Sequence, residues 1–531
     1  MLNYRRRIVQ PLFQPLLVVA ILLLSVLQVS AEIATVVEAD QVAENWLSYM
    51  VFQKGEWAGS PAPEAQVGQA MVVNDTLLGY YFEVEPMGFI VVPALKELPP
   101  IKAYSERCRF DINEAYGFPA LLKEVLLNRM NFYARAYGDL GVPQPDTGEV
   151  VLGRGHRLEW DRFLQTDQEF EDDLFRGRYE PMTEVGPLLT TSWHQRAPYS
   201  NNTPRGDSLC DTCSSGNDPH SRTLVGCVAL AASQIMNYWE WPPYGRGSYS
   251  YTWTGDSSCR SSTASQTLSV TLSDTYDWAN MPDSCDDGCS AADSAALAEL
   301  CYEVGVTFNM NYGVCGSGAY TGRAVQVFRD YFYYDNAIEK VDRSDTTATG
   351  WFGIIKTEIN NDRPMEYRIS NHAIVCDGWR DTGGLNQYHM NYGWGNSFNA
   401  WYSVDSLWCS WETDSLCPWD EEYLVRYIQP AAEVLLCDTL YDGKGGPLTE
   451  AGGPYLITCN ALVPTGQTLT IQSGAVVYFD YGKKVTVDGT LNASGTQSKP
   501  VKLYSKRIPR RGLKIQSGLK LQNGEELRLG S

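Results

Sequence analysis

The sequence predicts a mixed α+β protein of several units, and three observations support this class. At 531 residues the chain is too long for one hydrophobic core, and about three domains of ~150 residues are expected. Between residues 36 and 137, segments with helical spacing of apolar residues flank short runs of β-branched and aromatic residues. Past Pro430, short alternating strands carry a repeated motif, at Leu469–Gly474 and Leu513–Gly518.

The composition excludes two broad classes of protein. Lys and Arg total 42 against 63 Asp and Glu, which gives a formal net charge of −21. A surface this acidic repels phosphate backbones, so we expect no nucleic-acid partner. Because 44% of the residues are apolar and 12% are aromatic, the chain can form packed cores, which excludes wholesale disorder.

The start of the chain, residues 1–31, is typical of a signal peptide. Arg5, Arg6 and Arg7 precede an apolar run at 16–27, and residues 29–31 supply the small side chains of a cleavage site. A membrane anchor is the alternative, but the run is shorter than the ~20 residues that span a bilayer. We therefore expect a secreted or cell-surface protein that is not held in the membrane once the signal peptide is removed.

Residues 32–145 are predicted to form a small α/β unit. Two segments have helical spacing of apolar residues, and two runs between them are typical of strands joined by a turn. The helices are expected at Val36–Met50 and Leu121–Tyr137, and the strands at Leu78–Phe82 and Phe89–Val92.

The rest of the chain divides into three parts. Residues 146–185 are rich in acidic side chains, which favours an exposed linker open to proteolysis. Residues 186–432 hold most of the tryptophans and cysteines and are predicted to form the largest core. Residues 433–531 are β-rich, and the repeated motif indicates either stacked β-coils, as in a β-helix, or a small sandwich.

The 14 cysteines of an exported chain predict disulfides. Eleven lie from Cys210 to Cys417, so at least one of these is free or pairs outside the region. If Cys227 is the free one, the others form up to five bridges. Cys437 and Cys459 are expected to pair, and Cys108 stands alone in the N-terminal third.

A zinc site is the alternative for some of these cysteines. Two closely spaced pairs offer four thiolates, which is a familiar zinc ligand set. Export favours oxidation, and no nearby histidine completes a finger, so we expect disulfides and neither a metal nor another cofactor. The two pairs are Cys210 with Cys213, and Cys285 with Cys289.

Cys227 is the candidate nucleophile. It follows Gly226 and precedes a helix-forming stretch with small residues, so it is expected at a helix N-terminus. The exposed N–H groups and the helix dipole there favour the thiolate, which is the reactive form of the side chain.

His372 is the candidate base. It begins a predicted strand, and a turn near residues 381–384 leads to a second strand that ends near Asn391. Such a hairpin brings Asn391 close to His372, and a Cys–His pair oriented by an Asn suits nucleophilic catalysis. The other histidines are expected to be structural: His156, His194, His220 and His389.

These segments resemble the streptopain family of papain-like cysteine peptidases. The resemblance rests on Gly226-Cys227, on His372 followed by Ala-Ile-Val, and on the run from Tyr388 to Gly395. Upstream, residues 189–201 are similar to the family's entry segment, and residues 32–145 to its inhibitory propeptide.

The resemblance implies a two-lobed papain-like domain and a role for each candidate residue. Cys227 would be the nucleophile, His372 the general base and acid, and Asn391 the residue that orients the imidazole. Gln195 and the Cys227 N–H would hold the oxyanion, and Trp394 would shield the His–Asn bond at the edge of the substrate site. The substrate-binding wall would be Gly316, Ser317, Gly318 and Ala319.

The function implied is that of a secreted cysteine endopeptidase made as a zymogen, which cuts proteins or peptides and is inhibited by its own propeptide. Two alternatives stay open. The chain could be an inactive binding protein on the same scaffold, although all four expected catalytic side chains are present. It could also be a surface-attachment protein that acts through its β-repeats.

Overall fold

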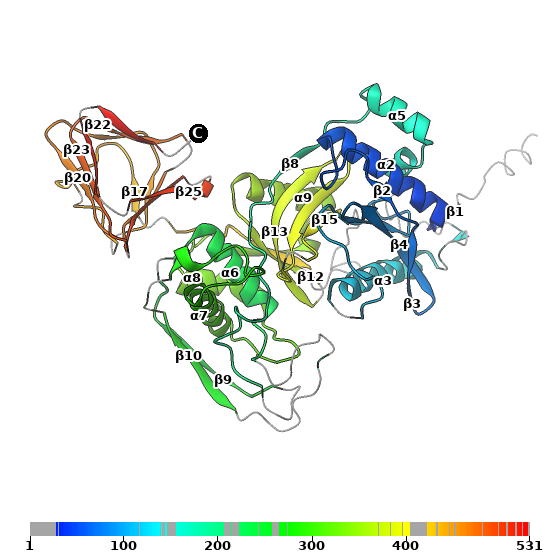
Figure 1. The fold of residues 1–531 in the computed structure, drawn as a ribbon, viewed down its shortest axis with the longest axis horizontal. Helices are drawn as coiled ribbons and strands as arrows, with labels where there is room; N and C mark the ends of the chain where they lie inside the picture. The colour runs from blue at the N-terminus through cyan, green and yellow to red at the C-terminus, as the bar shows by residue number, and fades with distance from the viewer. Residues whose placement is uncertain are drawn as a thin grey trace, which may run out of the picture.

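A computed structural model gives the fold of the chain (Figure 1). It describes residues 28–528, apart from 30, 116, 139, 141–143, 146–155, 207–212, 214–221, 243, 257–264, 273, 275, 370, 383, 396, 404–421, 432–433, 445, 451–452, 480–481, 498, 506–507, 516–517 and 523. The predicted signal peptide lies almost wholly outside these residues. None of the helices within them combines the length and apolarity needed to cross a bilayer.

The N-terminal unit is a small sheet with one long helix on each face (Figure 1). Helix α2 begins at a capping box between Thr35 and Glu38, and α3 packs against the opposite face of the sheet. Both predicted helices and both predicted strands are confirmed. The elements are α2 (Val36–Lys54), β2 (Glu64–Ala65), β3 (Gln69–Val73), β4 (Thr76–Glu85), β5 (Phe89–Pro93), β6 (Ala103–Ser105) and α3 (Gly117–Tyr137).

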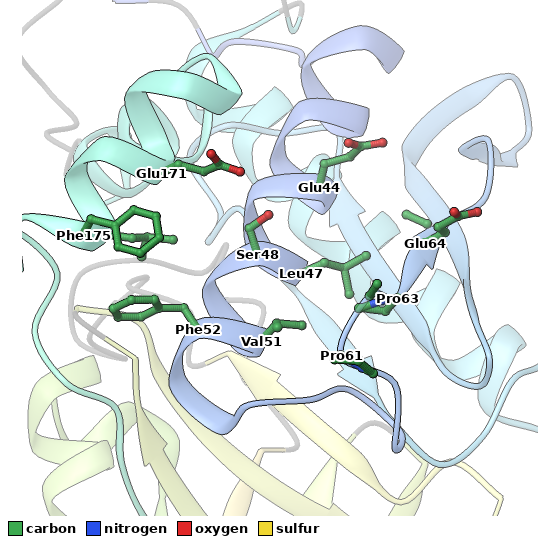
Figure 2. Close-up of a pocket in the computed structure, with 13 residues that line it drawn as sticks. Glu44, Leu47, Ser48, Val51, Phe52, Pro61, Pro63, Glu64, Glu171 and Phe175 are labelled. Carbon is green, nitrogen blue, oxygen red and sulfur yellow. The ribbon is translucent and has the colours of Figure 1, made fainter.

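The acidic linker is more structured than its composition predicts. Helices α4 (Arg157–Phe163) and α5 (Asp167–Phe175) bury Trp160 and Phe170 in the core beneath α2. Figure 2 shows α5 beside α2, with Phe175 near Phe52 at a ring-centroid distance of 6.2 Å. The expectation of a wholly exposed linker is therefore wrong for 157–175, because apolar residues between the acids anchor it.

One twelve-stranded sheet runs through both the N-terminal unit and residues 186–432. Strand β6 pairs with β15, so Tyr104 lies opposite Trp401 and Ala103 opposite Tyr402. The order is β11-β16-β12-β13-β14-β15-β6-β5-β4-β2, with β3 on β4 and β8 on β13. The further strands are β8 (Thr183–Val185), β11 (Glu339–Asp342), β12 (Met365–Ile369), β13 (His372–Asp381), β14 (Asn386–Asn391), β15 (Ala400–Ser403) and β16 (Tyr423–Arg426).

Helices cover both faces of the larger part of this sheet. Helix α6 packs on one face together with α7 and α8, and α9 packs on the other, so two cores form. The mixed α+β class is confirmed. The elements are α6 (Cys227–Trp239), the hairpin β9 (Ser248–Trp253) with β10 (Gln266–Thr271), α7 (Ala291–Thr307), α8 (Ala324–Tyr331) and α9 (Ala348–Asn360). Short pieces are β1 (Gln28–Val29), β7 (Gln144–Pro145), η1 (Trp278–Asn280), η2 (Thr321–Arg323) and η3 (Arg343–Asp345).

The C-terminal part consists of small sheets whose first strands pair in parallel and whose last strands, β25–β27, pair antiparallel. Its two motif copies are not equivalent, because Leu469 lies in a parallel pair and Leu513 in an antiparallel one. The strands are β17 (Val434–Leu436), β18 (Tyr455–Ile457), β19 (Ala461–Val463), β20 (Thr468–Ile471), β21 (Val476–Phe479), β22 (Lys484–Val487), β23 (Thr490–Ser494), β24 (Val501–Ser505), β25 (Ile508–Ile515), β26 (Gly518–Gln522) and β27 (Glu525–Arg528).

The cysteines follow the prediction in part. Cys437 pairs with Cys459 as expected, and Cys227 and Cys108 are free. Cys301 and Cys376 are also free, so the central cysteines cannot form five bridges. Both of these free cysteines lie in hydrophobic cores, where each packs as a small apolar side chain. Three of the four candidate zinc ligands form disulfides, so the zinc alternative is wrong for them. Cys213 pairs with Cys315, and Cys285 pairs with Cys289. Cys210, Cys259, Cys409 and Cys417 lie outside the described residues.

Candidate active site

Cys227 is the first residue of α6, as predicted. Gly226 precedes it with φ of 91°, and a Cβ there would lie 2.6 Å from the Met310 sulfur, so the approach requires glycine. Backbone N–H groups near the sulfur, among them those of Val228 and Ala373, favour the thiolate. Burial has the largest effect and raises the pKa of the Cys227 thiol, so the expected thiolate is not the resting form in this structure.

His372 begins β13, and two contacts fix its imidazole. Its Nε2–H donates to the carbonyl oxygen of Tyr392 at 3.0 Å, and the ring stacks on Trp394 at a centroid distance of 4.3 Å. Burial lowers the pKa of His372 to about 4, so the ring is neutral at pH 7. Among the described contacts no hydrogen bond joins Cys227 to His372, and this arrangement holds no ion pair ready for catalysis.

Asn391 lies at the end of β14, one residue before the carbonyl that holds His372. Its amide donates to the Thr191 carbonyl at 2.7 Å, and its oxygen accepts from the Gly393 N–H at 3.0 Å. The side chain therefore fixes the bend that carries Trp394 in this structure. Its role in orienting His372 stays a prediction.

Gln195 is half-buried and lies beside the nucleophile. Its carbonyl accepts from the N–H of Val225, two residues before Cys227, at 3.0 Å. The neighbouring Trp193 carbonyl accepts from the Gly395 N–H, so residues 193–195 contact both the segment that leads to Cys227 and the bend that carries Trp394. The role of the Gln195 side chain as an oxyanion donor stays a prediction.

Replacing this donor tests that role. A Gln195→Ala enzyme should have a kcat lowered by about 10²–10³-fold with little change in thermal unfolding, because one hydrogen bond to the developing oxyanion is lost. Steady-state kinetics on the processed enzyme measure it, and Gln195→Glu, which lacks the amide donor, should behave similarly. A variant with unchanged kcat would assign the oxyanion to another group.

The predicted substrate wall adjoins the same helix end. Ser317 Oγ donates to the Leu224 carbonyl at 2.7 Å, and Gly318 pairs with Asn311 through backbone bonds. The disulfide from Cys213 to Cys315 holds the start of the segment. Added Cβ atoms at Gly316 and Gly318 would meet nothing within 4 Å, so the wall faces open space.

Two charged residues of β12 were missed by the sequence reasoning. Glu366 is fully buried, and neither carboxylate oxygen has a hydrogen-bond partner among the described residues. Arg368, two positions along, is half-buried and close enough to influence both Cys227 and His372. The available signal was a strand, Met365–Ile369, whose apolar residues are interrupted by charges.

Because of Glu366, the free energy of unfolding should fall as the pH rises. Burial raises the pKa of its carboxyl well above the usual range, so the native state keeps a proton that the unfolded chain releases above about pH 4.3. The free-energy cost of keeping this carboxyl protonated is absent below that pH and grows as the pH rises toward the folded pKa, so the stability of the fold falls over this range. Glu366→Met should therefore raise the free energy of unfolding at pH 8 by about 1–3 kcal/mol, and by less near pH 4.

A matched control is available for this comparison. Glu358 is equally buried, but its two oxygens accept from Arg363 at 2.7 and 2.8 Å, so Glu358→Met should destabilise the fold. Denaturant unfolding at both pH values gives the comparison. A wild type more stable than Glu366→Met at pH 8 would contradict the assignment.

His389 belongs to a buried pair beneath the site. Its Nδ1 lies 2.6 Å from Asp377 Oδ1, and Asp377 Oδ2 accepts from the Leu189 N–H at 3.1 Å. The pair ties the strand that begins with His372 to the segment that leads to Gln195, which agrees with the expected structural role. Of the other histidines, His220 lies outside the described residues.

The N-terminal unit reaches the surroundings of His372. Phe118 of α3 contacts the Tyr392 ring at 5.3 Å and the Phe398 ring at 5.0 Å between centroids. Tyr392 in turn accepts the His372 hydrogen bond through its carbonyl. The unit therefore packs against the residue that holds the imidazole in its present place.

A thiol at a helix N-terminus, facing a strand headed by histidine and flanked by an amide side chain, defines a thiol-dependent acyl-transfer site. Residues 193–402 match the model of the Peptidase C10 family. This part of the chain is a cysteine-type peptidase of that family, the streptopain family, as the resemblance implies.

Curated relatives agree with this family. Streptopain of Streptococcus pyogenes is 25% identical over 336 residues, which cover 62% of this chain and 74% of that protein. The thiol protease/hemagglutinin PrtT of Porphyromonas gingivalis is 25% identical over 333 residues, which cover 61% of this chain and 33% of that protein.

Two solved structures are also similar. A fragment of Prevotella intermedia prointerpain A has 25% identity and a TM-score of 0.49, covering 68% of this chain and 99% of the fragment. Active interpain A has 27% identity and a TM-score of 0.37, covering 46% of this chain and 95% of the other.

Proposed function

We propose that this chain is the precursor of a secreted cysteine endopeptidase with a two-lobed, papain-like peptidase domain at residues 186–432. The observation that carries the proposal is the position of Cys227 at the start of α6, against the strand headed by His372. Cys227 forms the acyl-enzyme on a protein or peptide substrate. His372 first takes the thiol proton and then gives a proton to the leaving amine.

The arrangement of Cys227 and His372 in this structure is then that of the latent precursor. Cys227 is protonated, His372 is neutral, and the His372 Nε2–H is occupied by the Tyr392 carbonyl. Activation requires the thiol proton to pass to the imidazole, whose Nδ1 is the nitrogen not bonded to that carbonyl. That transfer creates the thiolate–imidazolium pair.

Residues 32–145 act in this proposal as the inhibitory propeptide. Strand β6 extends the peptidase sheet through β15, and Tyr104 is fully buried with its hydroxyl hydrogen-bonded to Arg380. Phe118 supports Tyr392 from the same unit. Because the propeptide shares a sheet with the enzyme, its removal frees an edge of β15 and the packing around His372 together.

The activating cut is expected in the linker, at its exposed part. Residues 176–178, 180 and 181 are exposed between α5 and β8, whereas α4 and α5 are anchored by buried side chains. An endopeptidase with an open cleft can cut such a segment. The mature enzyme would then begin between residues 176 and 186.

The C-terminal residues 433–531 are proposed to form a short β-helix-like stack attached to the peptidase. The parallel pairs β18–β21, β19–β22 and β20–β23 support stacked coils rather than a sandwich. Tyr504 OH donates to Glu240 at the end of α6 at 3.0 Å, which links the two parts.

N-terminal sequencing and active-site labelling test the whole proposal. The wild-type precursor should shorten on incubation, hydrolyse casein, and bind an epoxysuccinyl peptide at Cys227 only after shortening. An inactive binding protein would bind the epoxide in neither form. A precursor that never shortens and never hydrolyses casein would contradict the proposal.

A further inference from the structure

An open cavity of about 430 Å³ lies beside the end of α7 and the start of α8. These two helices are neighbours, and β9 packs against α7 (Figure 1). The lining of the cavity includes Asn309 after α7, Tyr320, and Arg323 with one side of α8. Because Tyr320 directly follows the predicted substrate wall, Gly316–Ala319, the cavity begins where that wall ends.

The substrate wall leads from the nucleophile to this cavity. Ser317 Oγ donates to the Leu224 carbonyl at 2.7 Å, and a Cβ at Gly226 would lie 3.2 Å from Ser317. Beyond Ser317, exposed residues alternate with half-buried ones, and Gly318 and Tyr320 are both exposed. The Tyr320 ring therefore shares the open side of the wall with Gly318.

The chain segment opposite the wall follows the same path. A Cβ at Gly226 would lie 2.6 Å from the Met310 sulfur, so residue 310 is beside the nucleophile. Asn311 pairs with Gly318 through two backbone hydrogen bonds, at 2.9 and 3.1 Å, and Asn309 lines the cavity. Two segments of chain thus connect the surroundings of Cys227 to the cavity.

Arg323 brings a positive charge to the cavity, and its own partners are neutral. Its Nε–H donates to the Thr307 carbonyl at 3.0 Å, and its Nη2 donates to the Tyr249 hydroxyl at 2.7 Å. The guanidinium also lies over the Tyr249 ring, 5.1 Å from the centroid. Within the described part of the chain no carboxylate pairs with Arg323, and these two bonds use only two of the five guanidinium N–H groups.

The other charges near the cavity do not neutralise Arg323. The second cation of the lining, Arg329, is paired with Asp330 at 2.8 Å. None of the described residues that line the cavity is acidic. A carboxylate that enters the cavity would therefore meet Arg323 without competition from a lining carboxylate of the protein.

An extended substrate would reach this cavity at a defined distance from the scissile bond. The proposed function places the attacked carbonyl at Cys227 and the preceding residues along the open side of the wall. Each residue of an extended chain advances by about 3.3 Å, and Tyr320 is three residues beyond Ser317. The third or fourth residue before the scissile bond therefore lies beside Tyr320.

We propose that this cavity is a substrate subsite, in which Arg323 binds a glutamate or aspartate located three or four residues before the scissile bond. The carboxylate accepts charge-assisted hydrogen bonds from the guanidinium, while the methylene groups pack against the Tyr320 ring. The inference rests on the proposed function and deepens it, because it gives the substrate class of the same cleft.

A positional series of fluorogenic peptides tests the inference. A single Glu is placed at the second, third, fourth or fifth residue before the scissile bond, each peptide has a matched Gln peptide, and the processed wild-type enzyme is used. The Glu-to-Gln ratio of kcat/KM should be about 5–10 at the third or fourth position and about 1 at the second, since a charged hydrogen bond at a half-buried site is partly screened. The difference should appear in KM, with kcat nearly unchanged, because Arg323 contacts a remote part of the substrate.

Variants of the cavity separate charge recognition from a structural effect. Arg323→Gln should bring the ratio to about 1, and Arg323→Lys should retain part of it. Lys356→Gln is the matched control, because Lys356 is also a half-buried cation over an aromatic ring, that of Trp379 at 4.1 Å, but lies on α9 at the opposite face of the sheet. It should leave the ratio unchanged, whereas Tyr320→Ala should weaken cleavage of the Glu and Gln peptides alike.

The outcomes also distinguish the inference from the function on which it rests. A ratio of about 1 at every position, with normal cleavage of the peptides, would overturn the subsite and leave the peptidase intact. A largest ratio at the second position, or a ratio that survives Arg323→Gln, would assign selection to another group. If Arg323→Gln fails to fold, the positional series on the wild type still decides. Cleavage of none of the peptides, and no hydrolysis of casein, would overturn both.

Discussion

A Cys227→Ser precursor should fold, lose peptide hydrolysis by about 10⁶-fold, and accumulate uncut. The hydroxyl is similar in size to the thiol but ionises far above neutral pH, and His372 cannot readily activate it in a site shaped for sulfur. Casein hydrolysis and the mass of the purified protein give the two readouts. The wild type should convert to a form that begins between residues 176 and 186.

Cys301→Ser is the matched control for this variant. Cys301 is also free, and it is fully buried in α7, so the same change leaves catalysis in place while testing for a general effect on folding. If purified Cys227→Ser shortened at the wild-type rate without added protease, self-activation by this thiol would be excluded. Shortening only after addition of active enzyme would indicate cleavage between molecules.

Phe118→Ala should weaken the latency of the precursor more than any other single change in the propeptide. The ring is 1% exposed and contacts Tyr392 and Phe398, and truncation of a buried Phe costs about 3–5 kcal/mol. If half of that free energy is lost from the contact between the propeptide and the peptidase, the latent arrangement is destabilised by the same amount. Labelling of Cys227 in uncut precursor should then accelerate by about 10-fold or more. Labelling by an epoxysuccinyl peptide, with uncut mass confirmed, measures the rate.

Phe163→Ala separates this effect from loss of propeptide stability. Phe163 is also buried, but it packs on Trp46 and Tyr49 in the core on the α2 side, away from Tyr392. It should lower the unfolding temperature of the precursor without a comparable increase in labelling. Equal labelling rates in the two variants would show that Phe118 acts only through stability.

The local elements could be predicted from the sequence because short-range signals fix them. Thr35 and Glu38 cap α2 where apolar spacing begins, and Gly226 permits the sharp entry to α6 at Cys227. The strand at His372 and the hairpin to Asn391 follow from runs of β-forming residues around a turn. Each of these signals lies within a few residues of the element that it specifies.

The long-range features could not be predicted in this way. The pairing of Tyr104 with Trp401 joins segments about 300 positions apart, and neither segment carries a local signal for its partner. The same limit explains the hydrogen bond of His372. The expected orienting residue was Asn391, but the adjacent Tyr392 carbonyl takes the imidazole, since Asn391 is already engaged by Thr191 and Gly393.

Composition alone also misjudged two regions. The acids of 167–173 predicted an exposed linker, yet Phe170 among them is fully buried and makes α5 a packed helix. The export signal predicted oxidation of nearly all central cysteines, yet Cys301 and Cys376 occupy core positions without a partner thiol. In both regions the structure depends on individual apolar side chains, which the average composition of the region does not reveal.

The pH dependence of Cys227 alkylation, in uncut precursor and in processed enzyme, tests the central claim most directly. Burial without an imidazolium partner keeps the thiol protonated in the precursor, so alkylation should begin only above about pH 8.5, the usual pKa of a free thiol. Pairing with His372 after processing should move the midpoint below about pH 7. The same midpoint in both forms would contradict a latent state in which the propeptide keeps the thiol and the imidazole apart.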